Sequence, residues 1–284
     1  MELVFNTNKY LRKLASVWDL FGPPNSPARL LRAYDARFFG NPFYISAQIY
    51  DEMQKMAQSR EGIRPLWFAF LDRNISTSKS DKRFTSLTKL VASLEIPMED
   101  ENGVLFRRFI KTFKGDFETY EKESAMLVGK IFGFTFPERL DVVLDLRGGV
   151  ARSGSSLIAD PPTIAMHLDK YERSCITLML HELLHALVRK NKIIRSDKQT
   201  PRWLEDAVIE YFVPHAIIDE KLGFIDSFNI DEFEKEREFA RPYAAEEFRR
   251  LLPHIKEYYK ICGKKTIWRF LEEKGFDTFR TNSS

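Results

Sequence analysis

One stretch decides how the rest of the chain is organised: residues 174–188, which read SCITLMLHELLHALV. Its centre has the pattern H-E-x-x-H, from His181 through Glu182 to His185. On a helix, residues four apart lie on the same face, so His181 and His185 can present two imidazole nitrogens to one metal ion. Glu182 lies about 100° round the helix from His181, within reach of a water molecule at that metal. Two neutral histidines, a third ligand and an open position make up a catalytic zinc centre.

The H-E-x-x-H spacing can arise by chance. The neighbouring residues help to decide between a chance occurrence and a metal site. Apolar residues occupy almost every side of the expected helix: Leu178, Met179, Leu180, Leu183, Leu184, Leu187 and Val188. This pattern predicts a buried helix. Polar groups without partners are costly inside a protein. A metal ion and its water would satisfy both histidines and the glutamate together, so we expect a metal site here.

The composition limits the class of protein. With 284 residues, 44% of them hydrophobic, the chain can form one large domain or two modest ones. Basic and acidic residues nearly balance, giving a net charge of +3, and they are interspersed, so no nucleic-acid partner is expected. Two cysteines, Cys175 and Cys262, indicate a reducing compartment. No signal peptide and no apolar run of about 18–20 residues is found, so we expect a cytoplasmic protein without a membrane partner.

The chain divides into two expected regions. Residues 1–115 have a mostly helical pattern, including helices over 26–40 and 45–59. Residues 116–284 begin with a helix ending at Gly133, followed by strands over 140–146 and 163–168 with a glycine- and serine-rich loop between them. Pro161 and Pro162 suit the start of an edge strand at 163–168. The expected class is α+β: a small mixed sheet with the H-E-x-x-H helix, a helical lower subdomain and a helical N-terminal region.

A second helix is expected after the motif. Thr200 as cap and Pro201 in the first turn begin it, and it runs to Phe212, just before Pro214. An H-E-x-x-H helix followed by such a helix resembles the gluzincins, the zincin metallopeptidases that include thermolysin and the aminopeptidase N-like enzymes. In that family the second helix carries an acidic zinc ligand, often within the pattern W-x-x-E-G-x-A-x-Y.

The resemblance leaves two candidates for the third ligand, Glu205 and Asp206. Trp203 and Tyr211 have the family's eight-residue separation, and in that frame Asp206 stands where the family has its glutamate. Asp206 is favoured because it keeps this frame and places Glu210 one turn later, where such sites carry an acid that orients a ligating histidine. The shorter side chain of Asp206 is the argument for Glu205.

The resemblance also suggests a tyrosine that binds the oxyanion formed during attack. Residues 242–252 resemble the tyrosine-containing helix of aminopeptidase-type gluzincins, so Tyr243 is the candidate for this role and Tyr211 is the second choice. A tyrosine that only packs in the core is an equal alternative. The exopeptidase motif G-x-M-E-N is absent, so aminopeptidase activity is not implied.

The resemblance implies a zinc-dependent peptidase acting on a peptide or protein. His181, His185 and Asp206 (or Glu205) would hold Zn²⁺, and Glu182 would be the general base. The substrate would add to the strand at 163–168 as a further strand. The alternative is a protein of the same scaffold that binds a metal and a partner without catalysis. Glu182 favours catalysis, since a structural zinc site needs no base and normally has four protein ligands.

Overall fold

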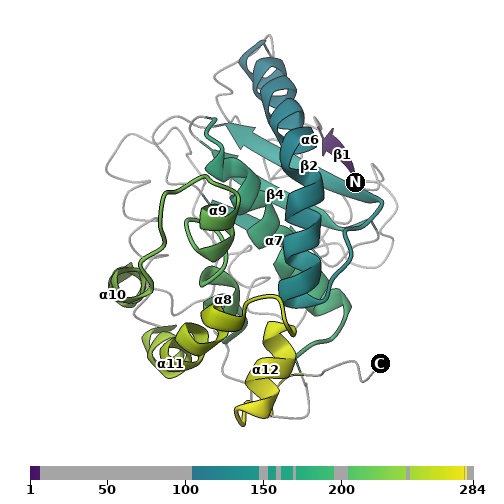
Figure 1. Ribbon diagram of the computed structural model, residues 1–284. Helices are drawn as coiled ribbons and strands as arrows, with labels where there is room; N and C mark the ends of the chain where they lie inside the picture. The colour runs from purple at the N-terminus through teal and green to yellow at the C-terminus, as the bar shows by residue number, and fades with distance from the viewer. Residues whose placement is uncertain are drawn as a thin grey trace, which may run out of the picture.

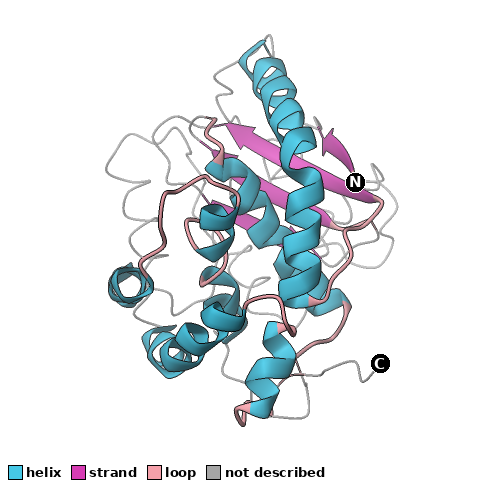
Figure 2. Cartoon of the chain, viewed as in Figure 1, coloured by secondary structure: helices cyan, strands magenta, loops and turns pink. Residues whose placement is uncertain are grey.

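The computed structural model describes residues 1–6, 104–146, 153–157, 161–168, 171–194, 204–240, 244–277 and 279. The helices expected over 26–40 and 45–59 lie outside these residues, as do Trp203 and Tyr243. Within the described residues the chain forms a mixed α/β structure, in which helices cover a small sheet (Figure 1, Figure 2).

The sheet has four strands in the order β1-β2-β4-β3. Their bounds are Glu2–Asn6 for β1, Arg139–Leu146 for β2, Ser153–Leu157 for β3 and Thr163–Leu168 for β4. β2 is parallel to both β1 and β4. β3 is antiparallel to β4, with Ser153 opposite His167 and Leu157 opposite Thr163. The small mixed sheet expected from the sequence is therefore confirmed.

Two expectations about the strands are wrong. Residues 153–157 form the strand β3 and not a loop, although serine and glycine have low β-propensity. β4 is not an edge strand, because it pairs with β2 on one side and β3 on the other. Pro161 and Pro162 precede the ladder, where their missing N–H groups interrupt no pairing, and the Pro162 carbonyl accepts a hydrogen bond from the Asp141 N–H at 3.0 Å.

Two helices lie in front of the sheet in Figure 2: α6 (Val104–Phe132) and α7 (Ser174–Lys190). α7 is the expected H-E-x-x-H helix, and it contacts β3, β4 and α6. α6 ends at Gly133, whose φ of 75° suits a glycine after a helix. It begins at Val104, so one helix continues across the boundary expected between residues 115 and 116.

The remaining described helices are α8 (Leu204–Glu210), α9 (Ile217–Lys221), α10 (Ile230–Ala240), α11 (Ala245–Ile261) and α12 (Ile267–Glu273). Of these, α9 lies to the left of α7 in Figure 1, and the others lie lower in that view. α8 contacts both α7 and α11. This arrangement brings the residues after the motif back against α7.

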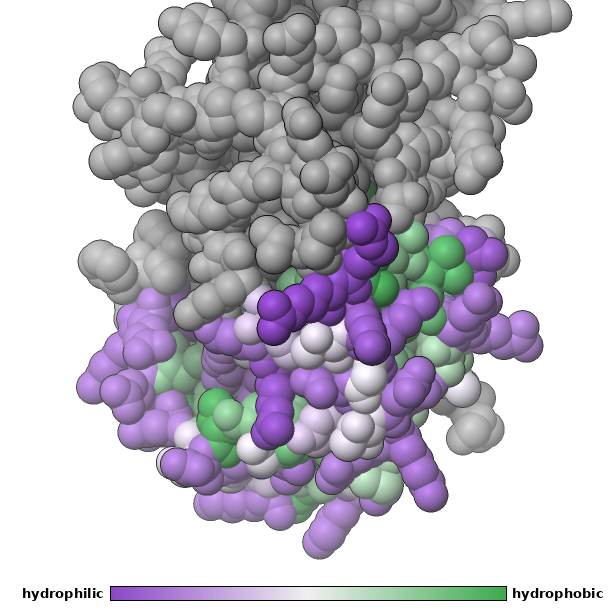
Figure 3. Space-filling view, turned by 90° about the horizontal axis from the view of Figure 1, so that it is seen from above, coloured by the Kyte–Doolittle hydropathy of each residue, from purple (hydrophilic) through white to green (hydrophobic). Residues whose placement is uncertain are grey.

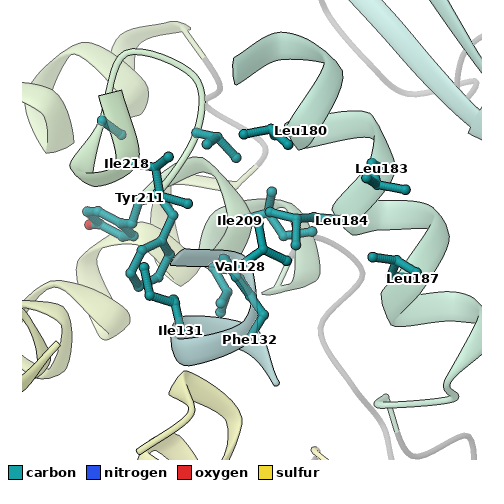
Figure 4. Packing of buried hydrophobic residues seen from close by; sticks show 14 of the residues in the cluster. Val128, Ile131, Phe132, Leu180, Leu183, Leu184, Leu187, Ile209, Tyr211 and Ile218 are labelled. Carbon is teal, nitrogen blue, oxygen red and sulfur yellow. The ribbon is translucent and has the colours of Figure 1, made fainter. Parts of the chain in front are cut away.

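The core extends over the sheet and the helices, and one part of it lies where α6, α7 and the segment from α8 to α9 meet. Figure 4 shows their side chains converging, among them Phe132 from α6, Leu184 from α7 and Ile209 from α8. All residues from Cys175 to Val188 are buried, as the sequence predicts for a helix that is apolar on almost every side. Close packing on every side holds α7 in one orientation, so its few polar side chains have fixed directions.

The surface in Figure 3 is mainly hydrophilic where the structure describes it, with hydrophobic side chains in small separate areas. Met126, 46% exposed, is the one exposed large hydrophobic residue among the described positions. Cys175 and Cys262 are both free thiols. In the described part of the chain, no helix is both long enough and apolar enough to cross a membrane.

Candidate functional site

One side of α7 carries a polar side chain at every fourth residue: Thr177, His181, His185 and Arg189, here called the polar stripe. Residues four apart lie one above the other on a helix, so these four share one face. The segment from α8 to α9, residues 204–221, supplies a partner to each of them. The H-E-x-x-H spacing is therefore part of a longer polar pattern.

Both histidines use their Nδ1 atoms in hydrogen bonds to this segment. The Nδ1 of His181 lies 3.0 Å from the carbonyl oxygen of Val213, and a carbonyl can only accept, so Nδ1–H donates. The Nδ1 of His185 lies 2.6 Å from Oε1 of Glu205, and Nε of Arg189 lies 3.3 Å from the same oxygen. In a neutral histidine these bonds select the tautomer whose Nε2 carries a lone pair.

The two Nε2 atoms are 3.2 Å apart. With both protons on Nδ1, two lone pairs approach each other, and this arrangement is unfavourable unless a cation, either a proton or a metal ion, binds them. Burial lowers the pKa of His185, but its hydrogen bond to Glu205 and the charges of Asp206, Glu205 and Glu182 outweigh burial, so the pKa is raised. The site therefore attracts positive charge to these nitrogens.

Three carboxylates surround the pair, in different places. Oδ1 of Asp206 lies 3.5 Å from Nε2 of His185, the nitrogen that faces His181. Glu205 lies at the opposite nitrogen of His185. Burial raises the pKa of Glu205. Its hydrogen bond to His185 and the charge of Arg189 together lower the pKa by more than burial raises it, so the net shift is downward. Glu182 is buried, with Oε1 4.0 Å from Nε2 of His181.

The distances can be compared with those of a zinc site. Around a tetrahedral zinc ion with bonds of about 2.0–2.2 Å, neighbouring ligand atoms are about 3.3–3.6 Å apart. The 3.2 Å between the two Nε2 atoms and the 3.5 Å from His185 to Asp206 are close to this value. Among the described residues, no group of three or more His, Cys, Asp or Glu side chains is arranged so that it could hold a metal ion as it stands. The donor types and two of the spacings fit zinc.

Two other residues expected at the site have different neighbours. Oε2 of Glu210, a buried carboxylate, lies 3.5 Å from Nε of Arg237 on α10. Glu205 and the Val213 carbonyl occupy the histidine-orienting positions that the resemblance assigns to Glu210. The hydroxyl of Tyr211 donates to the carbonyl of Phe248 at 2.9 Å, and burial raises the pKa of this tyrosine. Tyr211 thus joins α8 to α11, which gives no support to an oxyanion role.

Four residues around the histidines were not predicted from the sequence: Thr177, Arg189, Val213 and Asp219. Thr177 and Arg189 had a detectable signal, because they stand four residues before His181 and four after His185. Val213 contributes only its backbone carbonyl, so its side-chain type gives no indication of the contact. Asp219 contacts the stripe from 42 residues away in sequence, and no local pattern predicts that contact.

Comparison with known proteins gives no match: no family model, no curated protein and no solved structure is significantly similar to the chain. The resemblance to gluzincins therefore rests on the residues quoted above.

Proposed function

We propose that the protein is a zinc-dependent peptidase. The observation that carries the proposal is the pair of Nε2 atoms of His181 and His185, 3.2 Å apart, while both Nδ1 atoms point to other acceptors. The proposed ligands are these two nitrogens and the carboxylate of Asp206. Zinc bound there would act as a Lewis acid and lower the pKa of a water molecule to about 7.

Glu182 is the proposed general base. It follows His181 directly on α7, and its carboxylate lies 4.0 Å from the His181 Nε2. Its side chain is only 7% exposed, so bulk water has little access to its carboxylate. In the proposed reaction Glu182 accepts a proton from the attacking water and delivers it to the leaving amine, as a positioned carboxylate can. A metal site with a purely structural role would not need this residue.

A peptide is the proposed substrate because the helix that carries the H-E-x-x-H motif contacts an edge strand. β3 pairs with β4 along one edge only within the described sheet, and α7 contacts β3. An extended peptide can add to such an edge through backbone hydrogen bonds, largely independent of its sequence. β3 thus replaces β4 as the proposed docking strand. The two free thiols agree with a reducing compartment, and we propose the cytoplasm.

The proposal predicts peptide cleavage that depends on zinc. Protein loaded with zinc is expected to cleave members of a broad peptide library, with products identified by mass spectrometry. A chelator should reduce cleavage to background because it removes the Lewis acid, and added zinc should restore it. Absence of cleavage by fully loaded protein across the library would contradict the proposal and would favour a metal-dependent binding protein.

A further inference from the structure

Asp219 is a fully buried carboxylate in α9 that contacts α7. Its Oδ1 accepts a hydrogen bond from the hydroxyl of Thr177 at 2.7 Å, and its Oδ2 accepts one from the Ala216 N–H at 3.3 Å. Burial raises the pKa of Asp219, and these two bonds oppose that shift. The second bond is a usual contact at the start of a helix. The first is not, because it joins α9 to the polar stripe.

Residues 211–216 connect the end of α8 at Glu210 to the start of α9 at Ile217. Backbone bonds fix both ends: the Val213 N–H donates to Ile209 at 3.0 Å, and the Ile218 N–H donates to Phe212 at 2.9 Å. The Val213 carbonyl in this connection accepts the Nδ1–H of His181. A continuous series of contacts therefore links Thr177 to Asp219 in α9, then residues 211–216, and then His181, which lies one helical turn after Thr177 on α7.

We propose that Thr177 and Asp219 are positioning residues for the metal site. They hold the connection between α8 and α9 so that the Val213 carbonyl accepts a hydrogen bond from the Nδ1–H of His181. The lone pair of this histidine then lies on Nε2, where it could bind the metal. Partners of this kind fix the tautomer and direction of a ligating histidine. This inference rests on the proposed metal site, because it assigns how one of its ligands is prepared.

The first test is the zinc affinity of Thr177→Val, which keeps the shape of the side chain and removes its hydroxyl. The zinc dissociation constant is expected to rise by about 10–100-fold, the usual effect of losing a group that orients a ligand. Thr177→Ser, which retains the hydroxyl, should restore wild-type affinity. Thr119→Val is the matched control, because Thr119 is exposed on α6 and its hydroxyl donates to the Gly115 carbonyl, one turn earlier on the same helix, at 3.1 Å.

The second test reads the tautomer of His181 in the zinc-free protein. With five histidines in the chain, their ring nitrogens can be resolved by ¹⁵N NMR at about pH 8, above the ordinary histidine pKa of about 6.5. Wild-type His181 should carry its proton on Nδ1, and Thr177→Val should show a mixture of tautomers. A merely structural role would lower the melting temperature without changing this signature.

Asp219→Asn is the second variant, should Thr177→Val fail to fold, and it should also produce the tautomer mixture. Folded variants with wild-type zinc affinity and an unchanged His181 tautomer would overturn the inference. Wild-type His181 protonated on Nε2 would overturn it as well. Failure of the wild type to bind zinc would instead contradict the proposed function, and the tautomer comparison on zinc-free protein would still decide the role of Thr177 and Asp219.

Discussion

Glu182→Gln is expected to keep its zinc and to lose about 10²–10⁴-fold in kcat/KM for peptide cleavage, the usual contribution of a general base. Glutamine has nearly the same size as glutamate, so the packing of this buried position in α7 should be maintained. Its amide cannot accept a proton from water, so the chemical step loses its base. Zinc content and kcat/KM should be measured on the same preparations.

Glu246→Gln is the control for this experiment. This substitution makes the same chemical change at an exposed position on another helix, α11. It should retain wild-type activity. If Glu182→Gln retains full activity, another group is the base and the assignment of Glu182 is wrong. If zinc-loaded wild type cleaves no peptide, the alternative of a binding protein that uses the same metal site is favoured.

Asp206→Ala is expected to lose tight zinc binding, whereas Glu205→Ala should only weaken it. Asp206 lies 3.5 Å from the Nε2 of His185 that faces His181, so it is the proposed third ligand, and a catalytic zinc site has only three protein ligands. Glu205 contacts the other nitrogen of His185. Loss of such an orienting carboxylate raises a metal dissociation constant by about 10–100-fold.

Zinc titration of both variants with a competing chelator distinguishes the two roles. The predicted order of affinity is wild type, then Glu205→Ala, then Asp206→Ala. The reverse order for the two variants would show that Glu205 is the ligand. Circular dichroism of the zinc-free proteins provides the control, because both residues lie in the first turn of α8 and an unfolded α8 would imitate loss of a ligand.

Local patterns in the sequence predict those parts of the fold that depend on local chemistry. The apolar residues on almost every side of the helix around His181 predict the burial of α7, and Gly133 predicts the end of α6. β4 has the bounds expected from the sequence, Thr163–Leu168. The position of β4 inside the sheet depends on pairing with β2 and β3, which no local pattern reports. β3 is missed because its serines and glycine have low β-propensity and its pairing with β4 defines it as a strand.

The candidate site shows the same division. The spacing of His181, Glu182 and His185 identifies one face of one helix, because 3.6 residues per turn fixes their directions. Glu205 and Asp206 are adjacent, so their directions differ by about 100°, and packing of α8 against α7 and α11 decides which nitrogen of His185 each one reaches. The sequence could therefore propose both acids but could not assign their separate roles.

Elemental analysis of wild type and His185→Ala in parallel tests the central claim most directly. Both proteins would be incubated with zinc, freed of excess metal and analysed for zinc per chain. The proposed site predicts about one zinc ion in the wild type and little in the variant, because His185 supplies one of the two facing nitrogens. Wild type without zinc, or equal zinc in both proteins, would contradict a metal site built on the H-E-x-x-H helix.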